Sequence, residues 1–132
     1  MRVLQLHSDF MEFEPVEREA EESEESDRRR RRFEEVVVLF TSVEEGDTEE
    51  VARKAVLDAK SHLERLKVNR LLIYPYAHLS SSLAKPRDAL KIVKEMEEYA
   101  RELGVDVHRA PFGWNKQFSI SVKGHPLAEQ SR

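Results

Sequence analysis

Two stretches of helical periodicity, each followed by a short apolar run, constrain the fold of this chain most strongly. In residues 47–67 and again in residues 86–103, apolar side chains recur at helical spacing and charged side chains occupy the opposite side. Pro86 suits the first turn of the second helix, and Gly104 suits a residue just beyond its end. The pattern predicts two amphipathic helices that pack on a sheet. Their buried stripes are Val51, Ala55, Ala59, Leu63 and Leu66 in the first helix, and Ala89, Val93, Met96, Ala100 and Leu103 in the second.

Short apolar or alternating runs around these helices predict the strands. Residues 36–40 form a β-branched run that indicates a strand buried on both faces, and we expect it to pair with a first strand at residues 3–6. That first strand ends in the polar residues His7–Asp9. Further strands are expected at 71–74, 105–108 and 118–122, the last with Phe118, Ile120 and Val122 toward the core. The order β-β-α-β-α-β-β and the length of 132 residues predict a single α/β (α+β) domain over residues 1–132, with a mixed sheet.

Charge is concentrated in one segment of the chain. The formal net charge is −4, yet nine acids and one base lie between Glu12 and Asp27, and five arginines, Arg28–Arg32, follow directly. A block of like charge without an apolar period cannot offset its ordering entropy, so we expect a mobile loop at about residues 15–32. The arginines are either a counter-charge to the acids or a phosphate contact, and the sequence leaves both interpretations open.

Several classes of chemistry are excluded or disfavoured. The chain has no cysteine, which excludes disulfides, thiol nucleophiles and thiolate metal sites. Its five histidines show no HExxH or HxH spacing, and none of Ser80–Ser82 has a flanking glycine. We therefore expect neither a metal site nor a covalent serine mechanism. No apolar run approaches the roughly 18 residues of a membrane span, so we expect a cytoplasmic protein that needs no membrane.

His78 and Lys116 are the strongest candidates for chemistry. Each lies next to a proline-containing turn near a strand, where a rigid scaffold presents side chains to a cleft. A partly desolvated lysine can hold a water or a hydroxyl group and stabilise developing negative charge. Residue type alone does not decide between this chemistry and a structural role.

Three segments resemble the N-terminal editing domain of archaeal-type threonyl-tRNA synthetases. They are VLQLHSD at 3–9, YPYAHLSSSLAKP at 74–86, and APFGWNKQFSISVKGHPLAE at 110–129. With the matching element order, the similarity covers nearly the whole chain except the charged loop. The resemblance implies a D-aminoacyl-tRNA deacylase-like fold, a homodimer, and proofreading hydrolysis of L-seryl-tRNA(Thr) made in error. Such proofreading is needed because a missing methyl group is worth only about 1–3 kcal/mol in a synthetic pocket.

The resemblance also implies a set of site residues. The family's histidine in the PxAHLS turn falls on His78 and its lysine falls on Lys116, which implies that this pair is catalytic. Where the family often has tyrosine just before that lysine, this chain has Asn115. The resemblance further implies that the 2′-hydroxyl of the terminal ribose takes part in the reaction, and it implies no cofactor. The implied substrate-binding residues are Glu129, Asn115, Ala77, Pro75 and Phe112.

Two other functions stay open at this point. One is a general D-aminoacyl-tRNA deacylase, with the same chemistry and the opposite stereochemical preference. The other is a non-catalytic appendage for tRNA docking or dimerisation. We expect the partners to be the aminoacylated 3′ end of tRNA(Thr) and a second copy of the chain. We also expect the chain to be the N-terminal part of a longer synthetase, with a free-standing editing factor as the alternative.

Overall fold

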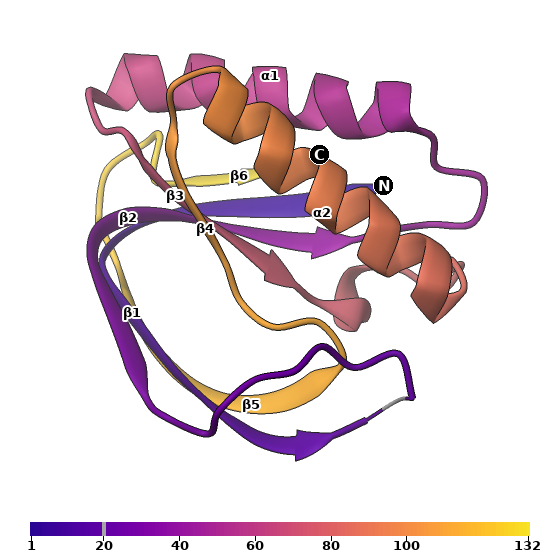
Figure 1. Cartoon of the computed structure of the whole chain (residues 1–132). Coiled ribbons are helices and arrows are strands. Elements are labelled where there is room, and N and C mark those ends of the chain that lie inside the picture. Colours follow the sequence, from indigo (N-terminus) through magenta and orange to yellow (C-terminus); the bar gives the residue numbers. More distant parts are fainter. Residues whose placement is uncertain (20) are drawn as a thin grey trace.

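The sheet carries both helices on one face (Figure 1). The structure is a computed structural model that describes residues 1–19 and 21–132. Within those residues the elements in chain order are β1 (Arg2–Arg18), β2 (Arg31–Ser42), α1 (Glu49–Leu66), β3 (Arg70–Pro75), the 3₁₀ helix η1 (Ala77–Leu79), α2 (Pro86–Glu102), β4 (Asp106–Arg109), β5 (Trp114–Val122) and β6 (Glu129–Ser131).

The strand order explains why both helices share a face. The sheet runs β4-β3-β2-β1-β5, and β6 pairs with the other end of the β1 edge that β5 occupies. Strands β2, β3 and β4 are parallel, whereas β1 is antiparallel to β2, β5 and β6. Parallel neighbours need crossover connections, which α1 and α2 supply. Because such crossovers are right-handed and successive strands are added in one direction, both helices fall on the same side.

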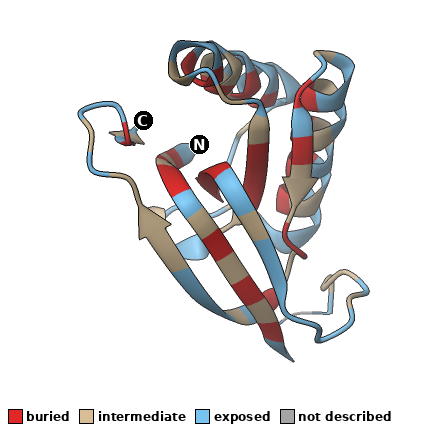
Figure 2. Cartoon of the chain, turned by 90° about the vertical axis from the view of Figure 1, so that its left-hand side faces the viewer, coloured by how far each residue is buried: buried red, intermediate tan, exposed pale blue. Residues whose placement is uncertain are grey.

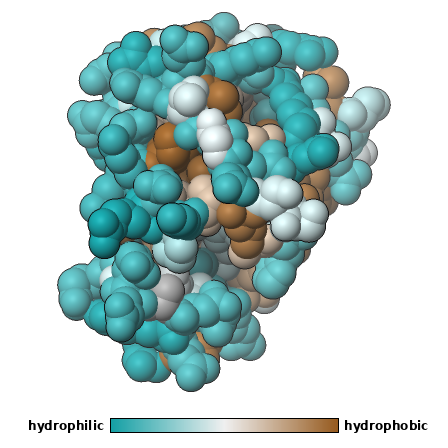
Figure 3. All heavy atoms as spheres, turned by 90° about the vertical axis from the view of Figure 1, so that its right-hand side faces the viewer, coloured by the Kyte–Doolittle hydropathy of each residue, from teal (hydrophilic) through white to brown (hydrophobic). Residues whose placement is uncertain are grey.

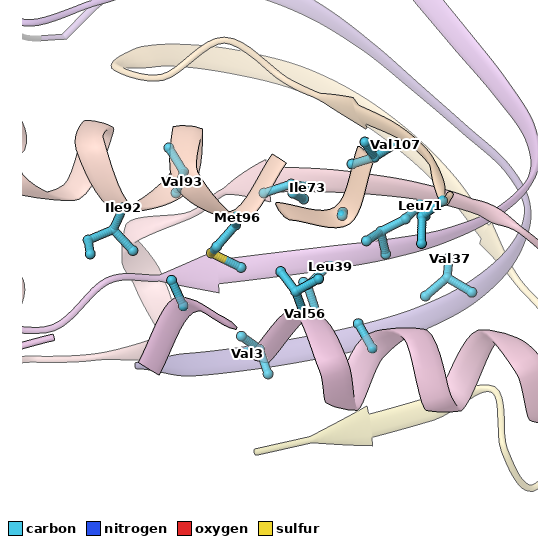
Figure 4. Packing of buried hydrophobic residues seen from close by; sticks show 14 of the residues in the cluster. Val3, Val37, Leu39, Val56, Leu71, Ile73, Ile92, Val93, Met96 and Val107 are labelled. Carbon is cyan, nitrogen blue, oxygen red and sulfur yellow. The ribbon is translucent and has the colours of Figure 1, made fainter. Parts of the chain in front are cut away.

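The main core lies between the helices and the sheet. Figure 4 shows Leu39 of β2 and Ile73 of β3 facing Val56 of α1 and Met96 of α2. All four side chains are at most 1% exposed. Burial of these apolar stripes is the dominant favourable contribution to folding of such a domain.

A second cluster lies on the opposite face of the sheet. The C-terminal half of β1, the start of β2 and β5 curve below the sheet and enclose it (Figure 1). Met11 and Phe13 from β1 are at most 1% exposed there, and Tyr74 of β3 is 2% exposed. The prediction that residues 36–40 are buried on both faces is confirmed, since all five are at most 3% exposed.

The predicted fold class and the two predicted helices are confirmed, but the bounds of the first strand and of the charged loop were wrong. Strand β1 does not end at His7–Asp9 but continues to Arg18. Because β2 begins at Arg31, the predicted loop at 15–32 was too wide at both ends. Buried and more exposed residues alternate along β1 (Figure 2), and the partly exposed Glu12 and Glu14 form ion pairs with Arg30. Ion pairing therefore allows charged residues that indicated a loop to lie in a strand. Mobility of the remaining connection stays a prediction.

The C-terminal part of the chain differs from expectation in three ways. Strand β5 begins at Trp114, so Lys116 lies within the strand and not in the turn before it. Phe118 points toward the second cluster but is 37% exposed, because β5 is an edge strand at this end of the sheet. The three-residue strand β6 was not predicted, since it is too short to show a pattern. No helix in the described ranges is long and apolar enough to cross a membrane.

The main core makes a direct prediction about stability. Met96→Ala removes a fully buried side chain between α2 and the sheet, and we expect it to lower the free energy of unfolding by about 2–5 kcal/mol. Leu57→Ala is the control on α1, where the side chain is 47% exposed, and it should change that free energy by less than about 0.5 kcal/mol. Urea denaturation followed by circular dichroism measures both. Equal effects would contradict the assignment of the core.

Candidate functional site

A cavity of about 490 Å³ opens where the parallel strands β2 and β3 end. The carboxyl ends of parallel strands are where ligands bind in open α/β sheets. Figure 3 views this side of the molecule and shows exposed apolar side chains in the middle of a hydrophilic surface. The lining comes from the ends of β2 and β3 with η1, from the start of α2 and the loop before it, and from β5 and the turn before it. Glu19, just after β1, also contributes. Its members include Thr41, Ser42, Tyr74, Pro75, Tyr76, Ala77, His78, Leu83, Pro86, Phe112, Asn115, Lys116 and Phe118.

His78 lies at the cavity in a turn that is held by hydrogen bonds to the hydroxyl group of one serine. The Ser42 hydroxyl at the end of β2 donates to the backbone carbonyl of Tyr76 and accepts from the amide of Leu79 at 3.2 Å. These two bonds join both ends of η1 to the sheet. His78 itself is exposed, and its ring lies edge-on to the Tyr76 ring with the centroids 5.0 Å apart. The imidazole is therefore accessible to a ligand while its backbone is fixed.

Lys116 is held with its ammonium group in the cavity wall. Its Nζ donates to the carbonyl oxygens of Pro111 and Trp114, both at 3.0 Å, and lies 4.9 Å from the centre of the Tyr74 ring. Burial lowers the pKa of Lys116 to about 8, against an opposing effect of the carboxylates of Glu19 and Glu24. An ammonium has three N–H donors, so two carbonyls leave one donor for a ligand.

Aromatic rings form the wall that removes water from Lys116. The Tyr74 ring contacts Phe118 and Phe40, with centroid distances of 5.6 and 5.1 Å. Burial raises the pKa of the Tyr74 hydroxyl, with a smaller contribution from Tyr76, so this phenol stays neutral. An apolar wall with a few polar groups is typical of a small-molecule pocket.

The structure brings together all but one of the residues that the sequence indicated. His78, Lys116 and Asn115 line the cavity, and so do Ala77, Pro75 and Phe112. Glu129 does not line it, because it lies in β6, opposite Leu6 of β1, with its side chain exposed. A role of Glu129 in substrate binding stays a prediction.

Other lining residues were missed by sequence reasoning. Ser42 and Tyr74 were not singled out. Tyr74 ends the predicted strand at 71–74 and Ser42 follows the predicted strand at 36–40 by two residues, and those positions were the available signal. Glu19 was assigned to the charged loop and gave no signal at all. Residues 1–19 and 21–132 contain no cluster of three or more histidine, aspartate or glutamate side chains arranged to hold a metal ion.

The arginine run is mostly paired with carboxylates. Arg29 and Arg31 lie near Asp27, Arg30 near Glu12 and Arg32 near Glu34, at nitrogen–oxygen distances of 3.2 to 3.9 Å. Arg28 instead has its guanidinium carbon 5.6 Å from the centre of the Trp114 ring. The contacts of Arg29–Arg32 support the counter-charge interpretation, and a phosphate contact stays a prediction.

Comparison with known proteins identifies the family. A family model described as the archaea-specific editing domain of threonyl-tRNA synthetase matches residues 1–132. The chain belongs to this family. The editing domain is 46% identical to the threonine–tRNA ligase of Nitrosopumilus maritimus, over 100% of this chain and 21% of that protein. It is 48% identical to the threonine–tRNA ligase editing subunit of Aeropyrum pernix, over 100% of this chain and 31% of that protein.

These matches cover all of this chain but only part of the curated relatives. The editing domain spans between about a fifth and a third of the length of these curated relatives. Among solved structures, the c-Myc DNA Unwinding Element Binding Protein matches with a TM-score of 0.74 over 100% of this chain and 97% of that chain. The identity is only 8%, so this likeness shows the fold alone.

The buried ammonium of the editing domain makes a prediction about pH. The pKa of Lys116 is about 8 in the folded state and about 10.5 in the unfolded state, so between these values the unfolded chain binds more protons. Stability must then rise with pH across this window. We expect the free energy of unfolding, relative to Lys116→Met, to rise by about 3 kcal/mol between pH 8 and 10.5. Urea denaturation of both proteins across this range measures the difference, and a constant difference would contradict the burial of the charge.

Proposed function

We propose that this chain hydrolyses L-seryl-tRNA(Thr), releasing serine and tRNA with a free 3′ end. The observation that carries the proposal is the pairing, in one cavity, of a water-shielded ammonium on Lys116 with an accessible imidazole on His78. Membership of the editing-domain family supports a proofreading task. The cavity volume of about 490 Å³ suits an aminoacyl group with part of the terminal adenosine.

The proposed reaction is the direct attack of water on the 3′ ester. Water adds to the carbonyl carbon and gives up a proton while negative charge develops on the carbonyl oxygen. The bond to the ribose 3′ oxygen then breaks, and that oxygen takes up a proton to become the free hydroxyl. The remaining N–H donor of Lys116 stabilises that oxyanion, and the low dielectric of the aromatic wall strengthens the interaction. His78 orients the water and the ribose 2′-hydroxyl. A pKa near 8 keeps Lys116 largely protonated at neutral pH, which this role requires.

The role of the tRNA in its own hydrolysis follows from what the lining offers. Besides Lys116, His78 and Asn115, the polar side chains of the lining are the Glu19 carboxylate, the phenols of Tyr74 and Tyr76, and two hydroxyls. Those hydroxyls, on Thr41 and Ser42, are already bonded to backbone groups. Asn115 can bind substrate through its amide, but it lacks the phenol that the family often has at this position. We propose that the 2′-hydroxyl of the terminal adenosine supplies the missing polar group beside the attacking water. Backbone groups of Pro75, Ala77 and Phe112 contact the amino acid.

Substitution of the two side chains tests the assignment. We expect Lys116→Met and His78→Ala each to lower the rate of L-seryl-tRNA(Thr) deacylation by about 10²-fold, as loss of an oxyanion donor or of a group that orients the reactants does. Lys123→Met and His108→Ala are matched controls, because neither residue lines the cavity. Deacylation is measured with tRNA charged with labelled serine. Unchanged rates in both cavity variants would refute the assignment.

The choice of substrate separates this proposal from its rivals. Cleavage of L-seryl-tRNA(Thr), with D-tyrosyl-tRNA and L-threonyl-tRNA(Thr) left intact, supports proofreading. Preference for the D-amino acid indicates the general D-aminoacyl-tRNA deacylase, and tRNA binding without turnover indicates a docking or dimerisation module. The proposed protein partners are a second copy of this chain, in a homodimer, and the remainder of a longer synthetase.

A modified substrate tests the contribution of the ribose. Seryl-tRNA(Thr) that ends in 2′-deoxyadenosine should be hydrolysed at least about 10²-fold more slowly than the normal substrate, because it lacks the group that positions water. The ester must be attached at the 3′ oxygen in both substrates, and spontaneous hydrolysis is subtracted. Equal enzymatic rates would remove the 2′-hydroxyl from the mechanism and leave the roles of Lys116 and His78 standing.

A further inference from the structure

The turn before β5 is contacted on two sides. On the cavity side, the ammonium group of Lys116 donates to the carbonyl oxygens of Pro111 and Trp114. On the outer side, the connection between β1 and β2 passes close to the same turn (Figure 1). The position of Lys116 therefore depends on the position of this turn, and the turn depends on what lies outside it.

Glu24 makes most of the outer contacts. Its backbone amide donates to the carbonyl oxygen of Phe112 at 3.0 Å, and its carboxylate accepts from the amide of Phe112 at 2.9 Å. Its carbonyl oxygen accepts from the indole Nε1 of Trp114 at 2.7 Å. One residue of the acidic segment thus satisfies three polar groups of two turn residues.

An ion-pair chain fixes the Glu24 carboxylate. Arg109, the last residue of β4, binds both carboxylate oxygens, with Nη2 at 3.0 Å from Oε2, and its Nε donates to Glu97 of α2 at 3.0 Å. The side chains of Arg109, Glu24 and Glu97 are only 11%, 19% and 21% exposed. Burial raises the pKa of the Glu24 carboxyl, but hydrogen bonds from Arg109 and Phe112 outweigh it and hold the pKa below its ordinary value. Bidentate, partly buried pairs of this kind are the strong ones.

Gly113 permits the close approach of the acidic segment. It has φ +81°, and a Cβ atom at this position would lie 2.7 Å from the Ser23 hydroxyl and 2.8 Å from the Ser23 Cα. The Ser23 hydroxyl donates to the Gly113 carbonyl at 2.7 Å, and the Glu19 amide donates to the same oxygen at 2.8 Å. The turn and the segment fit each other at backbone level.

We infer that Glu24 is a positioning residue for Lys116, acting through the Pro111–Trp114 turn that Glu24, Arg109 and Ser23 clamp from outside. The segment that looks like a solvated spacer in the sequence is thus part of the support of the cavity. The contacts of this clamp belong to the structure, and only their effect on hydrolysis rests on the proposed function. Loss of the clamp displaces the carbonyls that hold Lys116 and lets water reach its ammonium group.

The test compares Glu24→Gln with Glu21→Gln, an exposed carboxylate of the same segment. The first readout needs no substrate: the titration of Lys116, followed by NMR of its ¹³C-labelled ε-carbon. We expect the midpoint in Glu24→Gln to rise by about half a pH unit or more, toward the ordinary lysine value, because water replaces the protein around the ammonium. The midpoint in Glu21→Gln should stay at the unmutated value.

The direction in which the midpoint of Lys116 moves distinguishes a positioning role of Glu24 from a purely electrostatic effect of its charge. Loss of the Glu24 charge alone moves the midpoint down, because this carboxylate raises the pKa of Lys116. A downward movement, or no movement, in Glu24→Gln overturns the proposal even if the variant is less stable to heat. Ser23→Ala, which removes one bond of the clamp, is the milder variant if Glu24→Gln does not fold, and it should move the midpoint upward by a smaller amount.

Kinetics supply the second readout. We expect kcat for L-seryl-tRNA(Thr) to fall by about tenfold in Glu24→Gln with little change in KM, and not at all in Glu21→Gln. The double variant Glu24→Gln/Arg109→Gln should lose no more than the worse of the two single variants, because both break the same contact. Additive losses contradict a shared clamp. If the unmutated protein cleaves no seryl-tRNA, the proposed function fails, and the NMR titration still decides whether the clamp exists.

Discussion

The burial of β2 on both faces is the constraint on which the rest of the structure depends. Its residues 36–40 face the helices on one side and the curled part of the sheet on the other. A strand in that position needs a cover on each face, and the chain provides two different ones. The helices α1 and α2 cover the first face, and the bent ends of β1 and β5 cover the second.

The cavity follows from the way these two covers meet. At the carboxyl end of β2, the helix layer and the curled layer do not close completely, and the gap is lined from both. The helix side contributes Pro86 and Ala89, whereas the curled side contributes Lys116 and Phe118. The ammonium of Lys116, from the curled layer, and the imidazole of His78, on η1 just after β3, therefore line the same cavity. The apolar surroundings of the ammonium strengthen its electrostatic interactions relative to water.

The sequence could predict those parts of the fold and site whose signals are local. Helical stripes and the apolar run at 36–40 gave α1, α2 and β2, because burial of one face or of both imposes a period on the residues. The sequence points to His78 and Lys116 because they lie beside turns with distinctive residues, and both line the cavity, while their catalytic role stays a prediction. The length of β1 and the anchoring of Glu24 were missed for one physical reason: each depends on a partner distant in sequence. Glu24 looks like any neighbouring acid until Arg109 and Phe112, 85 and 88 residues away, are placed beside it.

The length of β1 bears on the cooperativity of unfolding. Seventeen extended residues reach about 55 Å if straight, whereas a domain of this size has a radius of gyration of about 14 Å. The strand must bend, and in bending it places Val3 in one core and Met11 with Phe13 in the other. Neither half of the molecule can then melt without freeing a strand that the other half needs. Slow amide hydrogen exchange should extend through both cores as one cooperative unit, and the cavity lies at the edge where the two cores meet.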